Sequence, residues 1–267
     1  MQLLTYDSWQ ILKQYHDGET LQQFSSLDDV FSCRGERIVK DKTSEVIKFK
    51  GSTNSFYIKR YTGPKRKYFS IFRKSVVRAE AENLVSMAGM GLPVPTVVAY
   101  GERRDKGHFL LGALITEEIK SSANLAQYLE NHPELLNNKK WLYTVIDQVA
   151  DYVHEMHSHS FVHRDLNLRN VLVQTRNHPE VHFIDCPAGG FRYGYFLKRE
   201  IVRDLAHLDK VARYILSTRD LLRFYKKYRK VNKLSSKDKV LISQIRHFHD
   251  KHRAKQNRKS EQPYRTL

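Results

Sequence analysis

The chain has 267 residues and a formal net charge of +17 at pH 7, and 40% of its residues are hydrophobic. This length allows two lobes with a sizeable core, and the composition excludes disorder across a whole domain. No stretch approaches the roughly 20 apolar residues of a membrane-spanning helix. Two cysteines, Cys33 and Cys186, are too few for a disulfide framework or a zinc site, and the N-terminus lacks a secretory signal pattern. We therefore expect free thiols and a cytoplasmic protein.

The positive charge is concentrated at the C-terminal end. Residues Lys226 to Leu267 include 14 Lys/Arg and 3 Asp/Glu. The other 225 residues include 32 Lys/Arg and 26 Asp/Glu, a much smaller excess of positive charge. A basic segment attracts polyanions, such as an anionic membrane, a phosphorylated glycolipid or a nucleic acid. A solvated basic helix with a frayed tail is the plain alternative.

Residues 1–118 are expected to form a small lobe rich in strands. Short apolar runs separated by polar turns indicate strands, and one helical pattern ends in a cluster of Gly and Pro residues. The expected strands are Arg37–Lys40, Glu45–Phe49, Phe56–Tyr61, Thr96–Gly101 and Phe109–Glu117, and the expected helix is Lys74–Gly89.

Residues 119–267 are expected to form a mainly helical lobe. Lys139–His157 has apolar residues at helical spacing, which predicts a buried amphipathic helix. The apolar runs Val171–Val173 and Val181–Ile184 fit a hairpin packed on that helix, and the helical pattern resumes from Arg199 to about His252. The whole pattern predicts an α+β protein of two lobes, the layout of a cleft enzyme.

The strongest motif is His163-Arg-Asp-Leu-Asn-Leu-Arg-Asn170, which precedes a strand, a turn and a second strand ending at Asp185. It matches the H-R-D-x-x-x-x-N catalytic loop of the protein-kinase-like fold. Phosphoryl transfer from ATP needs a carboxylate that accepts the proton of the attacking hydroxyl, which is the role expected of Asp165. Mg²⁺ prefers oxygen ligands, which Asn170 and Asp185 can supply. A polar turn between a helix and a hairpin is the alternative interpretation.

A kinase site also requires a lysine on the third strand and a glutamate on the helix that follows. Lys59 lies between apolar residues of the strand Phe56–Tyr61. Glu80 is an acid on an otherwise apolar helix face, so it needs a cationic partner, whereas Glu82 lies on the opposite face with Arg78. We therefore expect Glu80 to pair with Lys59. The apolar face of the helix also holds Val76, Leu84 and Met87.

Two further residues are expected to contact the nucleotide. The sequence has no G-x-G-x-x-G loop, and the equivalent turn is Asp41–Ser44. Its backbone amides or Lys42 are expected to contact phosphates, with an ordinary hairpin turn as the alternative. Glu117, at the end of the last strand of the small lobe, completes the expected nucleotide-binding set.

From about Gly35 to Tyr228 the sequence resembles the lipopolysaccharide core kinases of the Kdo kinase/WaaP family. The resemblance implies an ATP- and Mg²⁺-dependent kinase that phosphorylates a Kdo or heptose hydroxyl of the lipopolysaccharide inner core at the cytoplasmic face of the inner membrane. It also implies that Asp165 is the base, that Lys59 and Glu80 anchor phosphate, and that Asn170 and Asp185 bind metal. The motifs that carry it are Phe56–Tyr61, Arg78-Ala-Glu80, Leu92–Arg103, the H-R-D loop, Val202–Ala206 and Arg219–Tyr228.

Three other functions stay open on the sequence alone. A Ser/Thr protein kinase carries an A-P-E motif after its metal-binding Asp, but here no A-P-E appears and only 18 residues separate Asp185 from Asp204. The short segment favours a small or sugar acceptor. A nucleic-acid-binding module would use the basic C-terminal segment. A pseudokinase is disfavoured because the set of catalytic residues is complete, although Cys186-Pro187 stands where kinases have Phe-Gly.

Overall fold

The computed structural model describes residues 5–16, 22–63, 74–175 and 178–260, with the side chains of the last twelve of these left undescribed. The chain forms two compact units. The first comprises Met1–Ser121 together with His182–Gly189, and the second comprises Ser122–Val181 and Gly190–Leu267. The expected boundary after residue 118, and the division of nucleotide and acceptor binding between the lobes, stay predictions.

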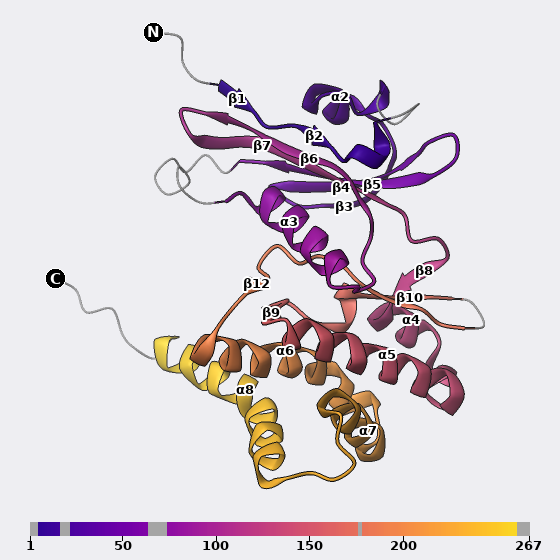
Figure 1. Cartoon of the computed structure of the whole chain (residues 1–267), viewed down its shortest axis with the longest axis vertical. Helices are drawn as coiled ribbons and strands as arrows, with labels where there is room; N and C mark the ends of the chain where they lie inside the picture. Colours follow the sequence, from indigo (N-terminus) through magenta and orange to yellow (C-terminus); the bar gives the residue numbers. More distant parts are fainter. Residues whose placement is uncertain (1–4, 17–21, 64–73, 176–177, 261–267) are drawn as a thin grey trace, which may run out of the picture. The chain divides into compact units, whose positions relative to one another are not determined.

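The first unit is built on an antiparallel sheet of order β1-β6-β7-β5-β4-β3, in which β2 also pairs with β6 (Figure 1). The five strands expected from the sequence are confirmed, and β6 continues to Asp105. β1 and β2 are additional. The strands are β1 (Thr5–Asp7), β2 (Gln10–Ile11), β3 (Glu36–Lys40), β4 (Ser44–Lys50), β5 (Ser55–Thr62), β6 (Val97–Asp105) and β7 (His108–Glu117).

Gly101 explains how the N-terminal strands cross β6. A Cβ atom at this position would lie 2.5 Å from the carbonyl oxygen of Ser8 and 2.6 Å from the Cα of Trp9. Only glycine allows such a close backbone approach. The indole N–H of Trp9 donates to the carbonyl of Phe24 at 2.8 Å, which ties the crossing segment to the core.

The two faces of the sheet are covered by different helices. Helix α2 (Leu27–Ser32) supplies Leu27 and Val30 to a core cluster that contains Ile58 of β5. Helix α3 (Val76–Gly89) packs Ala81 and Leu84 against Leu114. Because successive side chains of a strand point to opposite faces, Ile58 and Lys59 of β5 face different helices.

Helix α3 confirms the expected helix with one correction. It begins at Val76, two residues later than expected, because the Ser75 hydroxyl caps the N–H of Arg78. Val76 was expected on the apolar face but is 51% exposed, and Val77 begins the buried face instead. A residue in the first helical turn lies at the edge of the packed surface, so helical spacing alone misplaced it.

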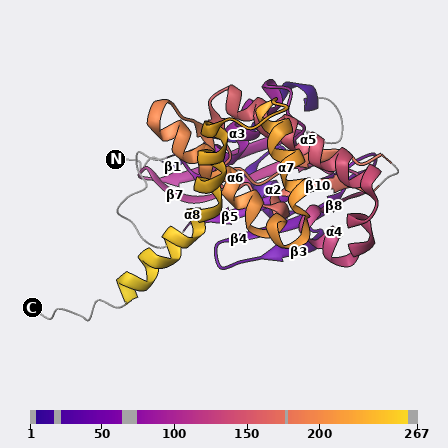
Figure 2. The same ribbon diagram turned by 90° about the horizontal axis from the view of Figure 1, so that it is seen from below.

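The second unit is mainly helical, with two small antiparallel sheets of order β11-β10-β8 and β12-β9. Helix α7 packs against α5, and α8 packs against α6, as both views show (Figures 1 and 2). The helices are α4 (Leu125–Asn131), η2 (Pro133–Leu136), α5 (Lys139–Ser158), η3 (Leu168–Asn170), α6 (Gly194–Ile215), α7 (Thr218–Arg229) and α8 (Ser236–Ser260), and the strands are β8 (Ser122–Asn124), β9 (Phe161–Val162), β10 (Val171–Gln174), β11 (Val181–Phe183) and β12 (Gly190–Phe191).

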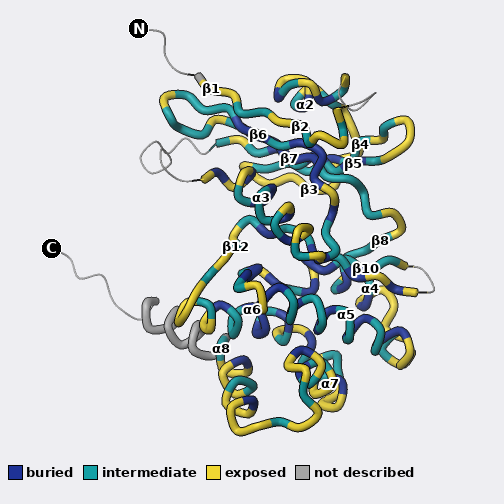
Figure 3. Tube along the Cα trace, in the orientation of Figure 1, coloured by how far each residue is buried: buried dark blue, intermediate teal, exposed yellow. Residues whose placement is uncertain are grey.

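Helix α5 and the β10–β11 hairpin confirm the sequence expectations. Buried and part-exposed residues alternate along α5 with helical spacing (Figure 3). The side chain of Gln148 accepts from the N–H of Val181 at 3.0 Å and donates to the carbonyl of Pro179 at 2.8 Å, which fixes the hairpin to the helix. The expected helical region from Arg199 in fact begins at Gly194.

Among the described residues, no helix combines the length and the apolar character that crossing a bilayer requires. Both cysteines are free thiols, with Cys186 buried and Cys33 half-buried.

Candidate active site

Lys59, Glu80 and Asp185 meet in the first unit. The Lys59 Nζ lies 3.0 Å from both carboxylate oxygens of Glu80 and 2.6 Å from Oδ1 of Asp185. The Tyr61 hydroxyl donates to Glu80 at 2.7 Å. Glu80 thus has the cationic partner that its buried position required, while Glu82 pairs with Arg78 on the exposed side of α3, as the helix-face argument predicted.

This cluster keeps Lys59 charged. Burial by itself lowers the pKa of Lys59, but the negative charge of Glu80, followed by Tyr61 and Asp185, raises the pKa above its ordinary value. Burial raises the pKa of Glu80, against the opposing charge of Lys59. The protonated amine of Lys59 thus bridges the carboxylates of Glu80 and Asp185.

Asp185 has a left-handed backbone conformation, with φ of 60°. This conformation is uncommon for non-glycine residues, and surrounding contacts must hold it. Neighbouring contacts hold the segment: the N–H of Phe183 donates to Pro93 O at 2.9 Å, and the Asn83 side chain donates to Cys186 O at 2.7 Å. The conformation therefore aims the Asp185 carboxylate while α3 and the chain after it fix the backbone.

Asp165 lies in the second unit on the loop after β9. The amide of Asn170 donates to Asp165 O at 2.8 Å and to Oδ2 at 3.1 Å, and the amide of Asn167 donates to Oδ1 at 3.1 Å. Two side-chain amides thus orient both carboxylate oxygens. The Asp165 side chain remains 53% exposed, so a hydroxyl acceptor has access to it.

The backbone before Asp165 is held by Asp204 of α6, whose carboxylate is fully buried. Its Oδ2 accepts from the N–H of His163 at 2.8 Å, and its Oδ1 accepts from the N–H of Arg164 at 2.7 Å. Arg164 has φ of 67°, again in the left-handed region, and its guanidinium pairs with Glu200 at 3.0 Å. Asp204 therefore fixes a strained peptide beside the candidate base.

Two buried side chains extend this support to helix α7. His157 Nε2 lies 3.3 Å from Oδ2 of Asp204, and its Nδ1 lies 2.9 Å from the hydroxyl of Tyr228. Because the Asp204 carboxylate can only accept, Nε2 carries the proton and Nδ1 accepts from Tyr228. Burial raises the pKa of Tyr228 above its ordinary value, so the hydroxyl stays a donor.

The other two expected nucleotide contacts lie in the first unit. Lys42 is exposed in the β3–β4 turn, where the N–H of Asp41 donates to Ser44 O at 2.8 Å. Glu117 ends β7, and its carboxylate accepts from Asn54 at 3.4 Å. Burial, with a smaller contribution from Glu117, raises the pKa of Tyr15 to about 12. The part of each residue in nucleotide binding stays a prediction.

Within the described parts of the chain, no three His, Cys, Asp or Glu residues gather as a metal-binding cluster. Mg²⁺ is usually held by one or two protein oxygens together with phosphates and water. The amide nitrogen of Asn170 donates to Asp165. The amide oxygen of Asn170 and the carboxylate of Asp185 are each of the oxygen type that Mg²⁺ prefers, and the part of each residue in metal binding stays a prediction.

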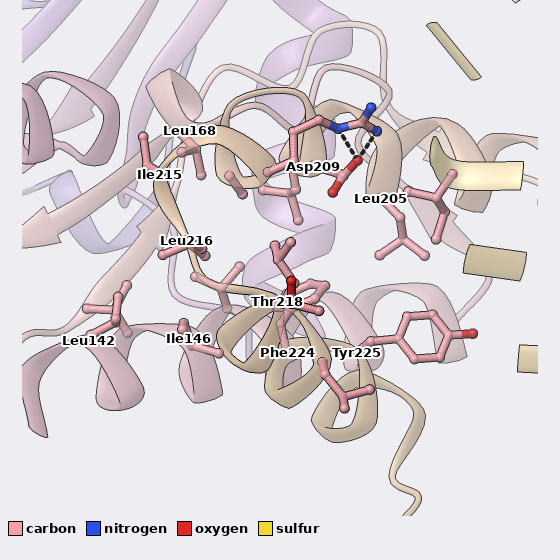
Figure 4. A pocket seen from close by; sticks show the side chains of 18 of the residues that line it. Leu142, Ile146, Leu168, Leu205, Asp209, Ile215, Leu216, Thr218, Phe224 and Tyr225 are labelled. Carbon is pink, nitrogen blue, oxygen red and sulfur yellow. Dashed lines mark hydrogen bonds and ion pairs between the residues drawn. The ribbon is translucent and has the colours of Figure 1, made fainter. Parts of the chain in front are cut away.

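The second unit also contains an apolar cavity of about 440 Å³ (Figure 4). Aliphatic side chains from α4 to α8 line it, including Ile146 of α5 and Leu205 of α6. Leu168, from the turn between Asp165 and Asn170, also lines it. The charged residues of its wall are the Asp209–Arg213 ion pair and Arg246.

Asp204 lies within one of the sequence motifs, but the sequence analysis predicted no role for Asp204. It also predicted no role for His157 or Tyr228 in the site. All three are polar residues within amphipathic helices. The observable signal was that each falls on the apolar face of its helix, where a polar side chain needs a partner. The same argument that selected Glu80 would have selected Asp204.

Comparisons with known proteins identify similar sequences and a similar fold. The chain is 30% identical over 109 residues to the 3-deoxy-D-manno-octulosonic acid kinase of Pasteurella multocida (strain Pm70), a match that covers 41% of this chain and 42% of that protein. The chain thus spans less than half the length of this curated relative. The fold is similar to a solved structure described as WaaP in complex with acyl carrier protein, with a TM-score of 0.71 and 19% identity, covering 91% of this chain and 98% of the other.

The family comparison is the most extensive of the sequence matches. Residues 19–228 match the model of the lipopolysaccharide kinase (Kdo/WaaP) family, a range that includes every candidate catalytic and metal-binding residue described above. The chain belongs to the lipopolysaccharide kinase (Kdo/WaaP) family.

Proposed function

We propose that this protein is an ATP- and Mg²⁺-dependent kinase that transfers phosphate to a Kdo or heptose hydroxyl of the lipopolysaccharide inner core. The observation that carries the proposal is the catalytic loop, in which Asn167 and Asn170 orient Asp165 while Asp204 fixes the preceding peptides. Family membership supplies the acceptor class.

In this proposal Asp165 orients the acceptor hydroxyl and takes its proton as the oxygen attacks the γ-phosphorus, while the bond from that phosphorus to the bridging oxygen breaks and ADP leaves. Such help is typically worth about 10² to 10⁴ in rate. The half-exposed carboxylate and the two amide donors suit this task, because a fixed carboxylate oxygen positions the hydroxyl without itself reorganising.

Lys59 binds a phosphate group of the nucleotide, and the ion pair with Glu80 fixes the position of the Lys59 side chain. When bound, Mg²⁺ with ATP supplies the transferable phosphoryl group and neutralises charge on its oxygens. Asp185 and Asn170 are the proposed metal ligands, and Lys42 and Glu117 are the proposed outer contacts to the nucleotide. The Lys59–Asp185 contact of 2.6 Å places a residue that would hold the metal beside the residue that would hold phosphate.

The test is transfer of label from radiolabelled ATP to purified Kdo–lipid A, to heptosylated core and to a generic protein acceptor. We expect label in a glycolipid and a loss of at least about 10² in the Asp165→Asn variant. Asp147→Asn, at an ion pair with Arg223 away from the catalytic loop, is the matched control and should retain activity. Label in protein alone would instead support the Ser/Thr protein kinase alternative.

A second binding function is favoured by the cavity. The structural neighbour was solved with acyl carrier protein, which delivers fatty acyl chains. An apolar cavity of about 440 Å³ has the size and lining that suit part of such a chain. We infer that the second unit binds an acyl group there, and that Leu168 couples its occupancy to the catalytic loop.

The proposed acceptor is a membrane glycolipid, so the protein acts at the surface of the bacterial inner membrane. The basic segment from Lys226 to Leu267 is one proposed contact with anionic lipid, and nucleic acid is not an expected partner. The side chains of the later half of this segment lie outside the described residues. The described part includes the exposed residues Lys233, Lys237 and Lys239.

A further inference from the structure

Four aromatic side chains within six consecutive residues are exposed at the start of helix α6. The exposed fractions are 46% for Phe191, 71% for Tyr193, 75% for Tyr195 and 64% for Phe196. The rings of Tyr195 and Phe196 pack edge to face, with centroids 6.0 Å apart. Large exposed aromatic groups gathered in this way mark an interaction surface. Residues 191–199 are called the aromatic segment below.

All charged residues of the aromatic segment are basic. It contains Arg192, Lys198 and Arg199, and the chain has no Asp or Glu from Cys186 to Arg199. Lys198 and Arg199 are exposed. Aromatic rings beside basic groups, without acids, suit the boundary of an anionic bilayer, where rings enter the headgroup layer and cations meet lipid phosphates.

The aromatic segment is firmly tied to the catalytic loop within the second unit. Phe191 of β12 pairs with Phe161 of β9, their rings lie 5.3 Å apart, and the N–H of Arg192 donates to Ser160 O at 2.8 Å. Strand β9 leads directly into the loop that carries Asp165. The Arg164–Glu200 ion pair adds a second connection, from the loop to α6.

We propose that the aromatic segment docks the protein on an anionic membrane surface and thereby presents the catalytic loop to an acceptor embedded in that membrane. This inference rests on the proposed function for the acceptor. Charge favours a bilayer over a second copy of the chain, because two copies meeting here would bring their uncompensated cations together. The basic C-terminal segment also contacts the membrane in this proposal. The aromatic segment contributes more to the affinity for the membrane than the C-terminal segment does.

The first experiment measures sedimentation with vesicles of phosphatidylcholine and phosphatidylglycerol in equal parts, without nucleotide or acceptor. We expect the double variant Tyr195→Ser/Phe196→Ser to bind about tenfold less tightly than the unmodified protein. The matched control is Tyr214→Ser, since Tyr214 is 79% exposed near the other end of the same helix. It should bind like the unmodified protein.

A charge-matched pair separates the aromatic segment from the C-terminal one. Lys198→Gln/Arg199→Gln should weaken vesicle binding several-fold, and Lys237→Gln/Lys239→Gln, which removes the same charge from exposed positions of α8, should weaken it less. Binding of all forms should fall on pure phosphatidylcholine and at high salt. Melting temperatures of the variants show that the exposed substitutions leave the fold intact.

Several outcomes would overturn the inference. These are no vesicle binding by the unmodified protein, equal losses in Tyr195→Ser/Phe196→Ser and Tyr214→Ser, or a larger loss in the C-terminal pair. A dimer that Tyr195→Ser/Phe196→Ser converts to a monomer would assign the surface to self-association instead.

A second readout compares kinase activity on vesicle-embedded Kdo–lipid A with activity on its deacylated, water-soluble core. The ratio should fall about tenfold in Tyr195→Ser/Phe196→Ser and stay unchanged in Tyr214→Ser. Vesicle binding needs no catalysis, so Asp165→Asn should sediment like the unmodified protein. Vesicle binding without any kinase activity would therefore contradict the proposed function and leave the docking surface standing.

Discussion

The carboxylate of Asp204 accepts a hydrogen bond of 2.7 Å from the backbone N–H of Arg164, the residue just before Asp165. Arg164 has a left-handed backbone with φ of 67°, and such a conformation persists only where surrounding contacts hold it. The buried carboxylate of Asp204, in the middle of α6, thus holds the backbone that leads into the candidate base.

Asp204→Asn should lower both activity and stability. An asparagine offers one acceptor oxygen where two backbone N–H groups need acceptors, so one buried N–H loses its partner at a cost of about 2 kcal/mol. The strained peptide then relaxes, and kcat should fall at least about tenfold with a smaller change in KM for ATP. Asp147→Asn, which weakens a part-exposed ion pair with Arg223 in the same unit, should change kcat by less than about twofold. Unchanged kcat in a folded Asp204→Asn protein would refute this positioning role.

Tyr228→Phe should also lower both activity and stability, but by less than Asp204→Asn does. The substitution removes the donor to His157 Nδ1 in a buried network, and the expected cost is about 1 kcal/mol in the free energy of unfolding. The control is Tyr225→Phe, because Tyr225 is equally buried but its hydroxyl contacts Asp238 at 3.3 Å. Denaturant titration should show similar losses for both variants, whereas only Tyr228→Phe should lower kcat. Equal kcat values would show that the network has no influence on the loop.

Lys59→Met should abolish most of the activity. It removes the proposed phosphate contact, and it leaves Glu80 buried with only Tyr61 as a donor. We expect kcat/KM for ATP to fall at least about 10² and the free energy of unfolding to fall by about 2 kcal/mol. Arg103→Met breaks the pairs with Asp7 and Asp28 in the same sheet and should leave kcat within about twofold. A fully active Lys59→Met protein would remove Lys59 from the proposed mechanism.

The stability of the same variant should depend more steeply on pH than the stability of the unmodified protein. Burial raises the pKa of Glu80, and loss of the Lys59 ammonium raises it further. The folded variant then binds more protons than the unfolded chain, so its stability is greatest at acidic pH and is lost as pH rises through the folded pKa of Glu80. Denaturant titrations from acidic to neutral pH test this. Lys59→Met/Glu80→Gln should have no such slope, and equal slopes in the two variants would exclude Glu80 as its source.

Filling the cavity should block acyl binding. Ala212 is 9% exposed and lines the cavity, so Ala212→Phe places a ring in space that an acyl chain would occupy. Val211→Phe, at the neighbouring exposed position, is the control. We expect affinity for a fluorescent fatty acid and for acylated carrier protein to fall at least about tenfold in Ala212→Phe alone. Equal affinity in both variants would exclude the cavity as the acyl site.

Much of the fold followed from local pattern. The β5 run and the α3 periodicity predicted that Lys59 and Glu80 would be a buried pair, because each placed a charged group among apolar neighbours that exclude water. The strands β1 and β2 escaped prediction, because they are very short and acquire their structure by pairing with β6 across a close contact at Gly101.

Other features depended on contacts between segments far apart in the chain. The spacing of apolar residues did not predict that α6 begins at Gly194 or that Tyr195 is exposed. A run of aromatic residues has the same sequence pattern whether it lies in a core or on a surface. The buried pairing of His157 with Tyr228 and Asp204 joins residues more than 40 positions apart.

The sequence by itself determined the chemistry: the catalytic loop, the lysine–glutamate pair and the family are all carried by residue types at fixed short spacings. The tertiary structure alone decided how the Asp165 carboxylate is oriented. It also decided which apolar side chains pack in the core, which line the cavity and which are exposed. The reason is physical, since short spacing fixes which side of a helix or strand a residue occupies. Only packing between distant segments decides what lies against that side.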